Sequence, residues 1–560
     1  MDELIILVGL AAILLYMIYL GFTEKKRRRR VLERRLKENY GKANSRKLKY
    51  EDLERISQFT KDNGCTRNGR DYFIDSLTWD DLNMDDIFCQ MAYTGSSVGD
   101  DYLYYLLHHP TQSEEVLKEL EAKVSYYQSN ADERIKLQVL FHEMGRLQHY
   151  SLSRYIRFME EMIPGKNTRH HLANFLLVGS LALMVFSMGA GFLLFIPCLC
   201  YNFFSYFRYK REMEPCLASF RYILSLLENG SRIEKELNPV WQREKERLSE
   251  NLNAFKDFQK NAYLLVSQGS MAGQGMELLL DYLRMCFHLD IIKFNSMLSH
   301  LKQHIGSLWE LYAHLGELDA CLAIGAYRAW LPTYSIPVFI HKKEIVLEEG
   351  YHPLVENAVS NCLVMKKNVL LTGSNASGKS TFLKTMGINV LLAQTIHTCP
   401  AKAFQLPFCY LFTAISLKDS VQLKESYYMA EIRAIKRILD CAKKDRQIVC
   451  MVDEVLRGTN TVERIAAATQ ILRQMSREGI LCMAATHDGE LTRILTMEYE
   501  NYHFEEEMVG QDVHFSYELK PGSASSSNAI RLLEAMGYDK KITEGARAMI
   551  EEYRERGEWR

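Results

Sequence analysis

The sequence lacks the marks of a protein held together by disulfides or zinc. Its thirteen cysteines are scattered, with no Cys-x-x-Cys pair and no repeated spacing of metal ligands. A chain of 560 residues is long enough to bury large cores without disulfide bonds. We therefore expect reduced, cytoplasmic thiols and no structural zinc.

The sequence also lacks a large net charge and internal repeats. The formal net charge is -1 at pH 7, which gives no global attraction to nucleic acid or to acidic substrates, so any such attraction must be local. The chain contains no internal repeat of fixed period and no low-complexity segment. Its length alone predicts about three or four domains.

Charge is also absent from two long hydrophobic runs. The first, Leu4 to Phe22, approaches the roughly 20 residues that cross a bilayer. Asp2 and Glu3 precede it and the cations from Lys25 to Arg30 follow it, whereas a secretory signal carries its cations in front. We expect an uncleaved transmembrane anchor with its C-terminal side in the cytoplasm. The cations then set the topology, and contact with anionic lipid or DNA phosphate is the alternative.

The second run, residues 170–207, contains no Asp, Glu, Lys or Arg. It is too long for one span and sufficient for two, with a turn predicted at Gly189, Ala190 and Gly191 and arms of about 17 residues. Cations precede and follow the run, so both of its ends are expected on the cytoplasmic side. The alternative is a hairpin buried inside a helical domain.

Helices are predicted on both sides of the second run, and an α/β domain after it. Apolar residues recur at spacings of three and four from about Tyr50 to Gly165 and again from Glu212 to about Tyr334. After Pro337, short aliphatic runs that each end in a polar or glycine-rich turn predict buried parallel strands. A last helical segment is predicted from Ser527 to Tyr553.

A phosphate-binding loop follows one of these strands. In TGSNASGKST, Gly373 is followed after four residues by Gly378, Lys379 and Ser380, which is the Walker A pattern between a strand and a helix. Glycines let backbone N–H groups approach phosphates, Lys379 neutralises the β and γ phosphates, and the Ser380 hydroxyl is suited to Mg²⁺. The predicted ATP-binding residues are Gly373, Ser374, Asn375, Ala376, Ser377, Gly378, Lys379, Ser380 and Thr381.

Acidic residues and a histidine follow two further strands. The run from Ile448 to Val452 ends in Asp453 and Glu454. A carboxylate at a strand end can hold Mg²⁺, and an adjacent one can deprotonate the attacking water. We assign Asp453 with Ser380 to the metal and Glu454 to the water, with His487 as a neutral imidazole that senses the γ-phosphate. The predicted cofactors are ATP and Mg²⁺, and the predicted reaction is ATP hydrolysis.

Six segments resemble the ATPase domain of the MutS mismatch-repair family in order and spacing. They are GYHPLVENAV, LLTGSNASGKSTFLKTM, LLAQTIHTCPA, FTAISLKDSVQLKESYYMAEI, VDEVLRGTNT and ATHDGELTRIL. The resemblance extends from about Leu82 to Tyr553, and it is most specific from Gly350 onward. It implies a homodimer with composite ATP sites, in which Ser426 reaches the γ-phosphate bound by the opposite subunit. Asp419 to Glu431 would communicate across the dimer, and Gly458 to Thr461 would form a loop at the same interface.

The sequence departs from the MutS pattern in several places. Lys424 and Glu425 replace the glycine and arginine that normally precede the signature serine, and the stretch NAVSNCLV lacks the aromatic residue expected against adenine, leaving Leu363 as the nearest large apolar substitute. No room exists before the helical core for the mismatch-recognition and connector domains. The Phe-x-Glu triplet at Phe22 belongs to the first hydrophobic run, so we treat it as a coincidence. The clamp domain that closes on DNA has no obvious counterpart.

The predicted fold is multidomain, with α-helical and α/β parts. We divide it into a transmembrane anchor (1–22), basic juxtamembrane and linker helices (23–80), a first part of a MutS-like helical core (81–165), a transmembrane hairpin (166–211), a second part of the core with the lever (212–345), a MutS-like ATPase domain of the ABC-like P-loop type (346–525) and a C-terminal helical dimerisation segment (526–560).

Together these patterns predict a multi-pass protein of the inner (cytoplasmic) membrane with its ATPase domain in the cytoplasm. The resemblance makes DNA the expected partner, in mismatch repair or related DNA repair, beside a second copy of the chain and membrane lipid. The alternative is a membrane-tethered ATP-driven switch that acts on a protein or lipid partner without DNA. An ABC-type transporter is a third hypothesis, which the small number of spans and the absence of an LSGGQ-like signature disfavour.

Overall fold

The computed structural model describes most of the chain. The described residues are 16, 19, 23–24, 26–64, 72–148, 150–259, 274–374, 377–415, 427–442, 446–456, 460–509, 512–523, 530, 533–534 and 536–556. The chain divides into two compact units. The helical unit comprises Met1–Arg67, Met91–Tyr105 and Lys123–Ala329, and the sheet unit comprises Asn68–Gln90, Leu106–Ala122 and Trp330–Arg560. The predicted anchor at Leu4 to Phe22 lies almost entirely outside the described residues.

The helical unit is built around one hydrophobic core. Phe59, Phe141, Ile156, Phe220 and Leu315 are all buried in it, and they come from helices spread over more than 250 residues of sequence. The amphipathic periodicity of the sequence is therefore used to bury one face of each helix. Helices that contribute to this unit are α2 (Tyr50–Gly64), α7 (Ala131–Met144), α8 (Leu152–Glu161), α9 (Thr168–Phe186), α10 (Met188–Glu236), α11 (Gln242–Asn253), α12 (Lys256–Gln259), α14 (Gln274–Phe287), α15 (Leu289–Gln303) and α16 (Ile305–Trp330), with parts of α4 (Met84–Met91), α5 (Ser97–His108) and α6 (Glu114–Ser129).

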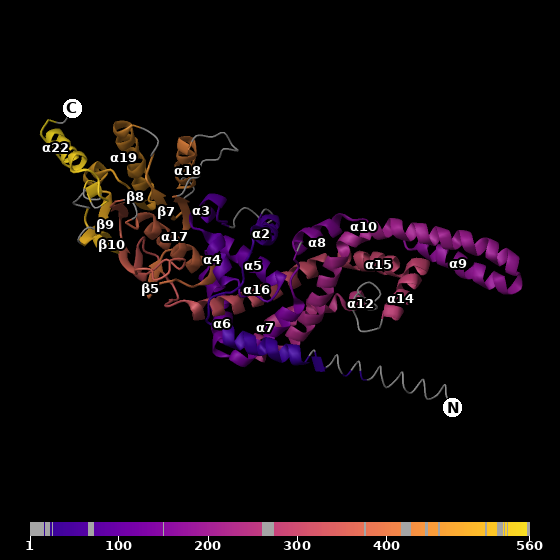
Figure 1. The fold of residues 1–560 in the computed structure, drawn as a ribbon. Helices are drawn as coiled ribbons and strands as arrows, with labels where there is room; N and C mark the ends of the chain where they lie inside the picture. Colours follow the sequence, from indigo (N-terminus) through magenta and orange to yellow (C-terminus); the bar gives the residue numbers. More distant parts are fainter. Residues whose placement is uncertain are drawn as a thin grey trace. The chain divides into compact units, whose positions relative to one another are not determined.

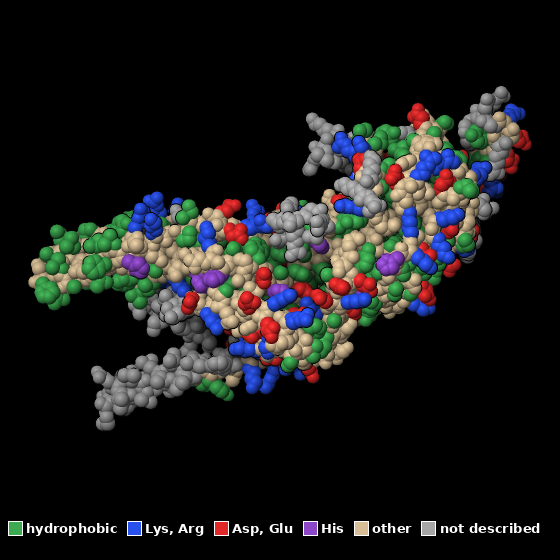
Figure 2. Space-filling view, turned by 180° about the vertical axis from the view of Figure 1, so that it is seen from behind, with side chains coloured by type: hydrophobic (Ala, Val, Ile, Leu, Met, Phe, Trp, Pro, Cys, Tyr) green, Lys and Arg blue, Asp and Glu red, His purple; other side chains and the backbone are tan. Residues whose placement is uncertain are grey.

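Helices α9 and α10 form a long antiparallel hairpin in the helical unit (Figure 1). Its distal part is covered with exposed apolar side chains, and Lys and Arg side chains gather where this apolar surface ends (Figure 2). Only 22% of Thr168–Phe186 and 11% of Met188–Arg211 is buried, and each segment is long and apolar enough to cross a membrane. A hairpin packed inside the unit would bury these residues, so the structure disfavours the buried alternative.

The turn of the hairpin is at Ser187, so the prediction of a turn at Gly189, Ala190 and Gly191 is wrong. Ser187 has φ −151° and ψ 101°, an extended conformation that needs no glycine. The three predicted turn residues belong to the beginning of α10. A Cβ on Gly191 would overlap the backbone of Met184, so this glycine instead allows α9 and α10 to pack closely.

Asp319 of α16 supports the start of α5 inside the helical unit. Its buried carboxylate accepts hydrogen bonds from the backbone N–H groups of Gly95 and Ser96, each at 2.9 Å. It also accepts one from the Ser96 hydroxyl at 2.6 Å. These are the unpaired N–H groups of a helix N-terminus, where a carboxylate is favourable. Burial nevertheless raises the pKa of Asp319 to about 6.

The sheet unit contains a six-stranded sheet in the order β10-β9-β4-β8-β7-β6. Strands β9, β4, β8, β7 and β6 run parallel, and β10 is antiparallel at the edge. A smaller sheet has the order β1-β5-β2-β3. Three of the aliphatic runs predicted as parallel strands are found as the parallel strands β4, β7 and β8, and every residue of β4 and β8 is buried. The prediction is wrong for the run IVLEE, because β2 pairs antiparallel with both of its neighbours in the smaller sheet. The strands are β1 (Val338–Phe339), β2 (Ile345–Gly350), β3 (Asn361–Met365), β4 (Asn368–Thr372), β5 (Ala403–Leu406), β6 (Tyr410–Ala414), β7 (Ile448–Asp453), β8 (Leu481–Ala485), β9 (Tyr499–Val509) and β10 (Asp512–Pro521).

Helices complete the sheet unit, and one of them comes from far upstream in the sequence. Asp81, at the end of α3 (Ser76–Asp81), accepts hydrogen bonds from the Thr413 hydroxyl at 2.6 Å and from the Ile415 N–H at 2.9 Å. This buried carboxylate therefore secures the C-terminal end of β6. The other helices of the unit are α17 (Lys379–Ile396), α18 (Tyr427–Ala442), α19 (Thr461–Arg477), α20 (Gly489–Ile494) and α22 (Lys540–Arg556), together with most of α4 and the remaining parts of α5 and α6.

Candidate active site

The phosphate loop joins the buried strand β4 to helix α17. Gly373 has φ +144° and Gly378 has φ +108°, values in the left-handed region that residues with a Cβ rarely adopt. A Cβ on Gly373 would also lie 2.8 Å from the Phe504 carbonyl oxygen. Both glycines of the motif are therefore required by backbone geometry. Asn375 and Ala376, also predicted as ATP ligands, lie outside the described residues.

Lys379 begins α17 and is 5% exposed. Its Nζ donates hydrogen bonds to the carbonyl oxygens of Gly373, at 2.8 Å, and Ser374, at 2.7 Å. The unpaired N–H groups and the positive dipole end of the 18-residue helix lie at the same place. The Ser377 hydroxyl is buried there without a hydrogen-bond partner among the described residues. The loop thus combines cation, dipole and donors in the manner of a phosphate site.

Ser380 and Asp453 lie side by side. Ser380 is in the first turn of α17, Asp453 is the last residue of β7, and the Ser380 hydroxyl donates a hydrogen bond to Asp453 Oδ2. Two hard oxygen ligands in contact fit Mg²⁺. Among the described residues no group of three His, Cys, Asp or Glu could hold a metal ion. A magnesium ion here would therefore complete its shell with phosphate oxygens and water.

Glu454 and His487 form a second pair at the same edge of the sheet. His487 Nε2 lies 2.8 Å from Glu454 Oε1, and the side chains are 35% and 14% exposed. Glu454 has φ +52°, which is unusual for a residue with a side chain, and its N–H donates to the Ala485 carbonyl oxygen at 3.0 Å. The backbone of β8 therefore holds the carboxylate in place. Arg464 reinforces this corner with two hydrogen bonds to Asp488, at 2.9 and 2.6 Å.

These side chains line one cavity of about 570 Å³, a volume that suits a small-molecule ligand. It brings together Lys379, Ser380, Thr381, Asp453, Glu454 and His487, six of the predicted site residues. These residues lie close together because β4, β8 and β7 are neighbours in a parallel sheet and their carboxyl ends lie at one edge. Gly378 also lines the cavity.

Tyr517 and His352 are among the cavity residues that were not predicted from the sequence. Tyr517 reaches Gly378, whose ideal Cβ position is 3.2 Å from the tyrosine ring, and its φ of +55° marks an irregularity in β10 between Phe515 and Leu519. Burial lowers the pKa of the second, His352, to about 4, so this histidine is neutral at pH 7. Leu363, expected from sequence as the adenine contact, is instead buried in β3 and is absent from the cavity lining. An irregular strand leaves no local sequence signal, so Tyr517 could not be found from sequence.

The predicted cross-subunit residues fall largely outside the described part of the chain. Ser426 is one of them, and of the segment Asp419 to Glu431 only the end, within α18, is described. Of the loop Gly458 to Thr461 the structure describes the last two residues. There Asn460 caps α19 by accepting a hydrogen bond from the Glu463 N–H at 3.0 Å.

Comparison with known proteins places this site in a family. MutS domain V matches residues 369–554, which include the phosphate loop, Asp453, Glu454 and His487. The DNA mismatch repair protein MutS of Thermotoga maritima is 30% identical over 268 residues, covering 46% of this chain and 33% of the relative. Those of Aquifex pyrophilus and Thermus thermophilus are 31% and 32% identical over 249 and 262 residues, covering 42% and 46% of this chain and 29% and 32% of the relatives. The matched part spans about a third of the length of these relatives, and residues 369–554 of this chain belong to the MutS domain V family.

Proposed function

We propose that this protein is a membrane-anchored, Mg²⁺-dependent ATPase that works as a homodimer and binds DNA. The observation that carries the proposal is the single cavity in which a phosphate loop meets the Ser380–Asp453 and Glu454–His487 pairs. Phosphate, metal and water sites are the parts that ATP hydrolysis requires.

In the proposed reaction the residues of the cavity have separate roles. The loop N–H groups and Lys379 bind the phosphates, while Ser380 and Asp453 hold Mg²⁺, which when bound neutralises phosphate charge. Glu454 accepts the proton of the attacking water. The His487 ring orients that carboxylate, because its Nε2 lies within hydrogen-bond distance of Glu454 Oε1.

The nucleotide base is proposed to lie against Tyr517. This ring borders the phosphate loop at Gly378 and is 45% exposed, so it offers an aromatic face to a planar base. Tyr517 would thereby take the place of the aromatic residue that the stretch before the loop lacks. Ser426 of the partner subunit is proposed to reach the γ-phosphate, which makes the site composite.

Membrane attachment is proposed to use the hairpin together with the anchor predicted at residues 1–22. The support is the exposed hydrocarbon of α9 and α10, with Val185 84% exposed and Phe186 87% exposed. Lys and Arg side chains at both ends of the hairpin sequence support a cytoplasmic side for its base. The resulting location is the inner membrane, with the ATPase site in the cytoplasm.

DNA binding is proposed from the names of the relatives, which are DNA mismatch repair proteins. The test is duplex binding by the detergent-solubilised full-length protein at increasing salt, with ATP hydrolysis measured in parallel. Binding that weakens steeply with salt, and a hydrolysis rate that changes with DNA, would support the proposal. Intact hydrolysis without binding at low salt would favour a membrane-tethered switch acting on protein or lipid.

A further inference from the structure

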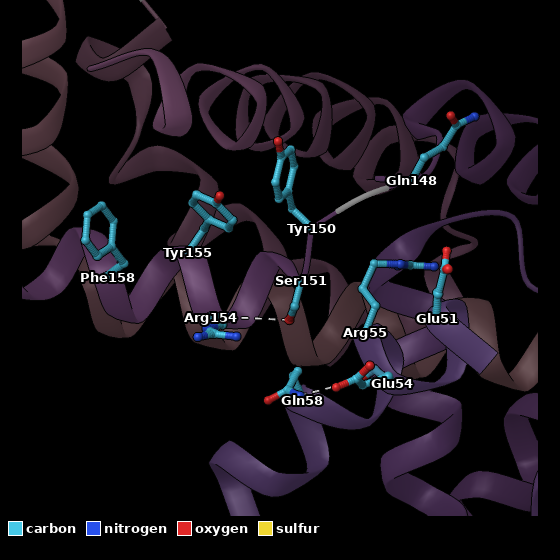
Figure 3. Close-up of a pocket in the computed structure, with 10 residues that line it drawn as sticks. All are labelled: Glu51, Glu54, Arg55, Gln58, Gln148, Tyr150, Ser151, Arg154, Tyr155 and Phe158. Atoms are coloured by element: carbon cyan, nitrogen blue, oxygen red, sulfur yellow. Dashed lines mark hydrogen bonds between the residues drawn. The ribbon is translucent and has the colours of Figure 1, made fainter. Parts of the chain in front are cut away.

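A second cavity, of about 620 Å³, lies in the helical unit between α2 and α8 (Figure 3). Its walls are held in place by the core and by contacts between the two helices. Ile156 and Phe59 are buried beneath it, and Arg157 of α8 donates a hydrogen bond to the carbonyl oxygen of Asp62 in α2 at 2.6 Å. The Ser151 hydroxyl caps α8. The cavity is therefore a preformed feature of the unit.

Arg55 lines this cavity and is 8% exposed. Its guanidinium donates no hydrogen bond to any described residue, and its one ion pair is to Asp52, with 3.6 Å between Nη2 and Oδ1. The Nε atom is sealed from solvent without a partner. Because a guanidinium has five N–H donors, burying it in this state is costly. The guanidinium of Arg55 is therefore suited to bind an anionic group of a ligand that enters the cavity.

Asp101, a buried carboxyl that interacts electrostatically with Arg55, does not supply the missing charge. Its Oδ1 has no hydrogen-bond partner in the described part of the chain, and Tyr312 donates a hydrogen bond to its Oδ2. Burial raises the pKa of Asp101 to about 8, so the group is mostly protonated at pH 7. Among the described residues Arg55 therefore has Asp52 as its one ion-pair partner, at 3.6 Å, and its N–H donors can bind an anionic group of a ligand.

Aromatic rings form the wall opposite α2. Figure 3 shows Tyr150, Tyr155 and Phe158 in a row along the α8 side. The ring centroids of Tyr150 and Tyr155 are 5.2 Å apart and those of Tyr155 and Phe158 are 6.4 Å apart. Tyr150 is 45% exposed and Phe158 49% exposed. Their faces and edges are open to a planar ring, which stacks favourably on such side chains.

The rim of the cavity carries groups of both charges. Glu51 and Glu54 are exposed carboxylates, which act as hydrogen-bond acceptors, and Arg154 is an exposed cation on the facing helix. The Gln58 amide makes only a long hydrogen bond, 3.5 Å, to the Glu54 carbonyl oxygen, so it is available to a ligand. Two carboxylates would repel a simple inorganic anion. They suit a ligand that combines an anion with hydrogen-bond donors.

We propose that this cavity is a second ligand site, which binds a nucleoside phosphate. The phosphate pairs with Arg55 and Arg154, and the base stacks on the face of Tyr155 and meets the Tyr150 ring, which is nearly perpendicular to it. Hydroxyl or amino donors of the ligand meet the two rim glutamates. A volume of about 620 Å³ accommodates a molecule of this size. The site belongs wholly to the helical unit, so it is distinct from the cavity at Lys379 and does not depend on ATP hydrolysis.

The test is equilibrium dialysis with the full-length, detergent-solubilised Lys379→Ala protein in the absence of Mg²⁺, which weakens binding at the phosphate loop. The probes are AMP, GMP, CMP and UMP, with inorganic phosphate and the four nucleosides as separate arms. At least one monophosphate is expected to bind about tenfold more tightly than phosphate or its own nucleoside, because both the phosphate and the nucleoside part of the ligand contact the cavity.

Substitutions in this background locate the binding. Arg55→Met is expected to weaken binding of the monophosphate by about tenfold or more, as loss of a charged hydrogen-bond partner does. Tyr155→Leu is expected to weaken it about fivefold while leaving phosphate binding unchanged. The control Arg247→Met makes the same replacement at an exposed arginine of α11 and should have no effect. If Arg55→Met fails to fold, Arg154→Met at the rim replaces it.

The proposal is overturned if no monophosphate binds at millimolar concentration, or if the substitutions at Arg55, Arg154 and Tyr155 leave binding unchanged. It is also overturned if inorganic phosphate binds as tightly as the nucleotides, because the aromatic wall would then contribute nothing. Loss of ATP hydrolysis in Glu454→Gln with intact monophosphate binding would separate this site from the proposed ATPase.

Discussion

The hairpin exposes hydrocarbon, whereas the phosphate-loop site buries charge. Leu193 and Phe204 of α10 are each 75% exposed, and Lys379 is only 5% exposed. Either arrangement is costly in water, which is why an exposed apolar patch or a buried charge carries more functional information than an exposed polar group. The two regions thus call for different partners, lipid for the hairpin and a polyanion for the loop.

Helix α16 shows that an apolar sequence alone does not distinguish these outcomes. Its residues from Leu318 to Arg328 are all buried, and Leu315 is fully buried in the core of the helical unit. The segments Thr168–Phe186 and Met188–Arg211 of the hairpin are also apolar and are mostly unburied, whereas the C-terminal part of α10 packs in the core. What separates them is the presence of partner helices, so the sharpest predictions alter one region while leaving the other intact.

The largest effect is expected from charges at the middle of the hairpin. Val178→Arg combined with Ile196→Arg places two cations at the expected bilayer centre, which disfavours insertion by about 5–7 kcal/mol. In a chain that lacks residues 1–22, so that the predicted anchor cannot hold it, membrane association measured by flotation with liposomes should fall strongly while ATP hydrolysis in detergent remains. Phe186→Arg with Met188→Arg, beside the turn at Ser187, is the matched control and should be tolerated because the turn reaches the far interface. Equal flotation of the two double variants would contradict a membrane-spanning hairpin.

The next effect concerns the catalytic pair. Glu454→Gln keeps the size and one oxygen of the side chain and removes the base, so the turnover rate is expected to fall about 10²–10⁴-fold while ATP binding persists. Phosphate release and nucleotide binding measure the two properties. Glu490→Gln, at an exposed position of α20, should leave both unchanged. Turnover near the wild-type rate in Glu454→Gln would show that this residue is not the base. Altered flotation of this variant would show that the phosphate-loop site affects membrane attachment by the hairpin.

A smaller effect separates the two kinds of apolar helix by stability. Leu315→Ala in α16 leaves a cavity in the core and should lower the free energy of unfolding by about 2–5 kcal/mol. Leu193→Ala in the hairpin removes the same atoms from an exposed surface and should change it by less than about 0.5 kcal/mol. Urea unfolding in detergent measures both. A comparable loss in the two variants would mean that the hairpin is packed against protein.

The smallest effect tests buried charge in the helical unit. The pKa of Asp101 is raised to about 8 and that of Asp319 to about 6, so folded chains retain protons that unfolded chains release. Stability is then greatest below the ordinary aspartate pKa and falls as the pH rises toward 8, by up to about 1.4 kcal/mol per pH unit for each group. Asp101→Asn should flatten this dependence between pH 6 and about 8. An unchanged slope of unfolding free energy against pH would contradict the assignment.

Much of the candidate site could be predicted because its signals are local. Gly373 and Gly378 occupy positions whose backbone angles require glycine, and Asp453 and His487 each follow a short aliphatic strand. Parallel strands put such ends at one edge, so neighbours in space could be inferred from separate motifs. The contact between Ser380 and Asp453 agrees with that inference.

Other features depend on contacts that no short stretch encodes. Asp81 secures β6 across more than 300 residues of sequence, and Tyr517 enters the cavity through an irregular strand. Glycines near residue 190 predict a turn there, but Gly191 serves helix packing, so the position of the hairpin turn does not follow from the local sequence. Arg55 could not be singled out either, since its lack of partners is a property of the packed unit.

The central proposal, that one chain joins a membrane hairpin to an ATPase site similar to that of MutS, has a direct test. Membranes containing the full-length protein or Glu454→Gln are washed with alkaline carbonate, and protein and Mg²⁺-dependent ATP hydrolysis are measured in pellet and supernatant. We predict that both proteins stay in the pellet and that only the wild-type pellet hydrolyses ATP. Release of the protein into the supernatant, or equal hydrolysis by the two pellets, would contradict the account.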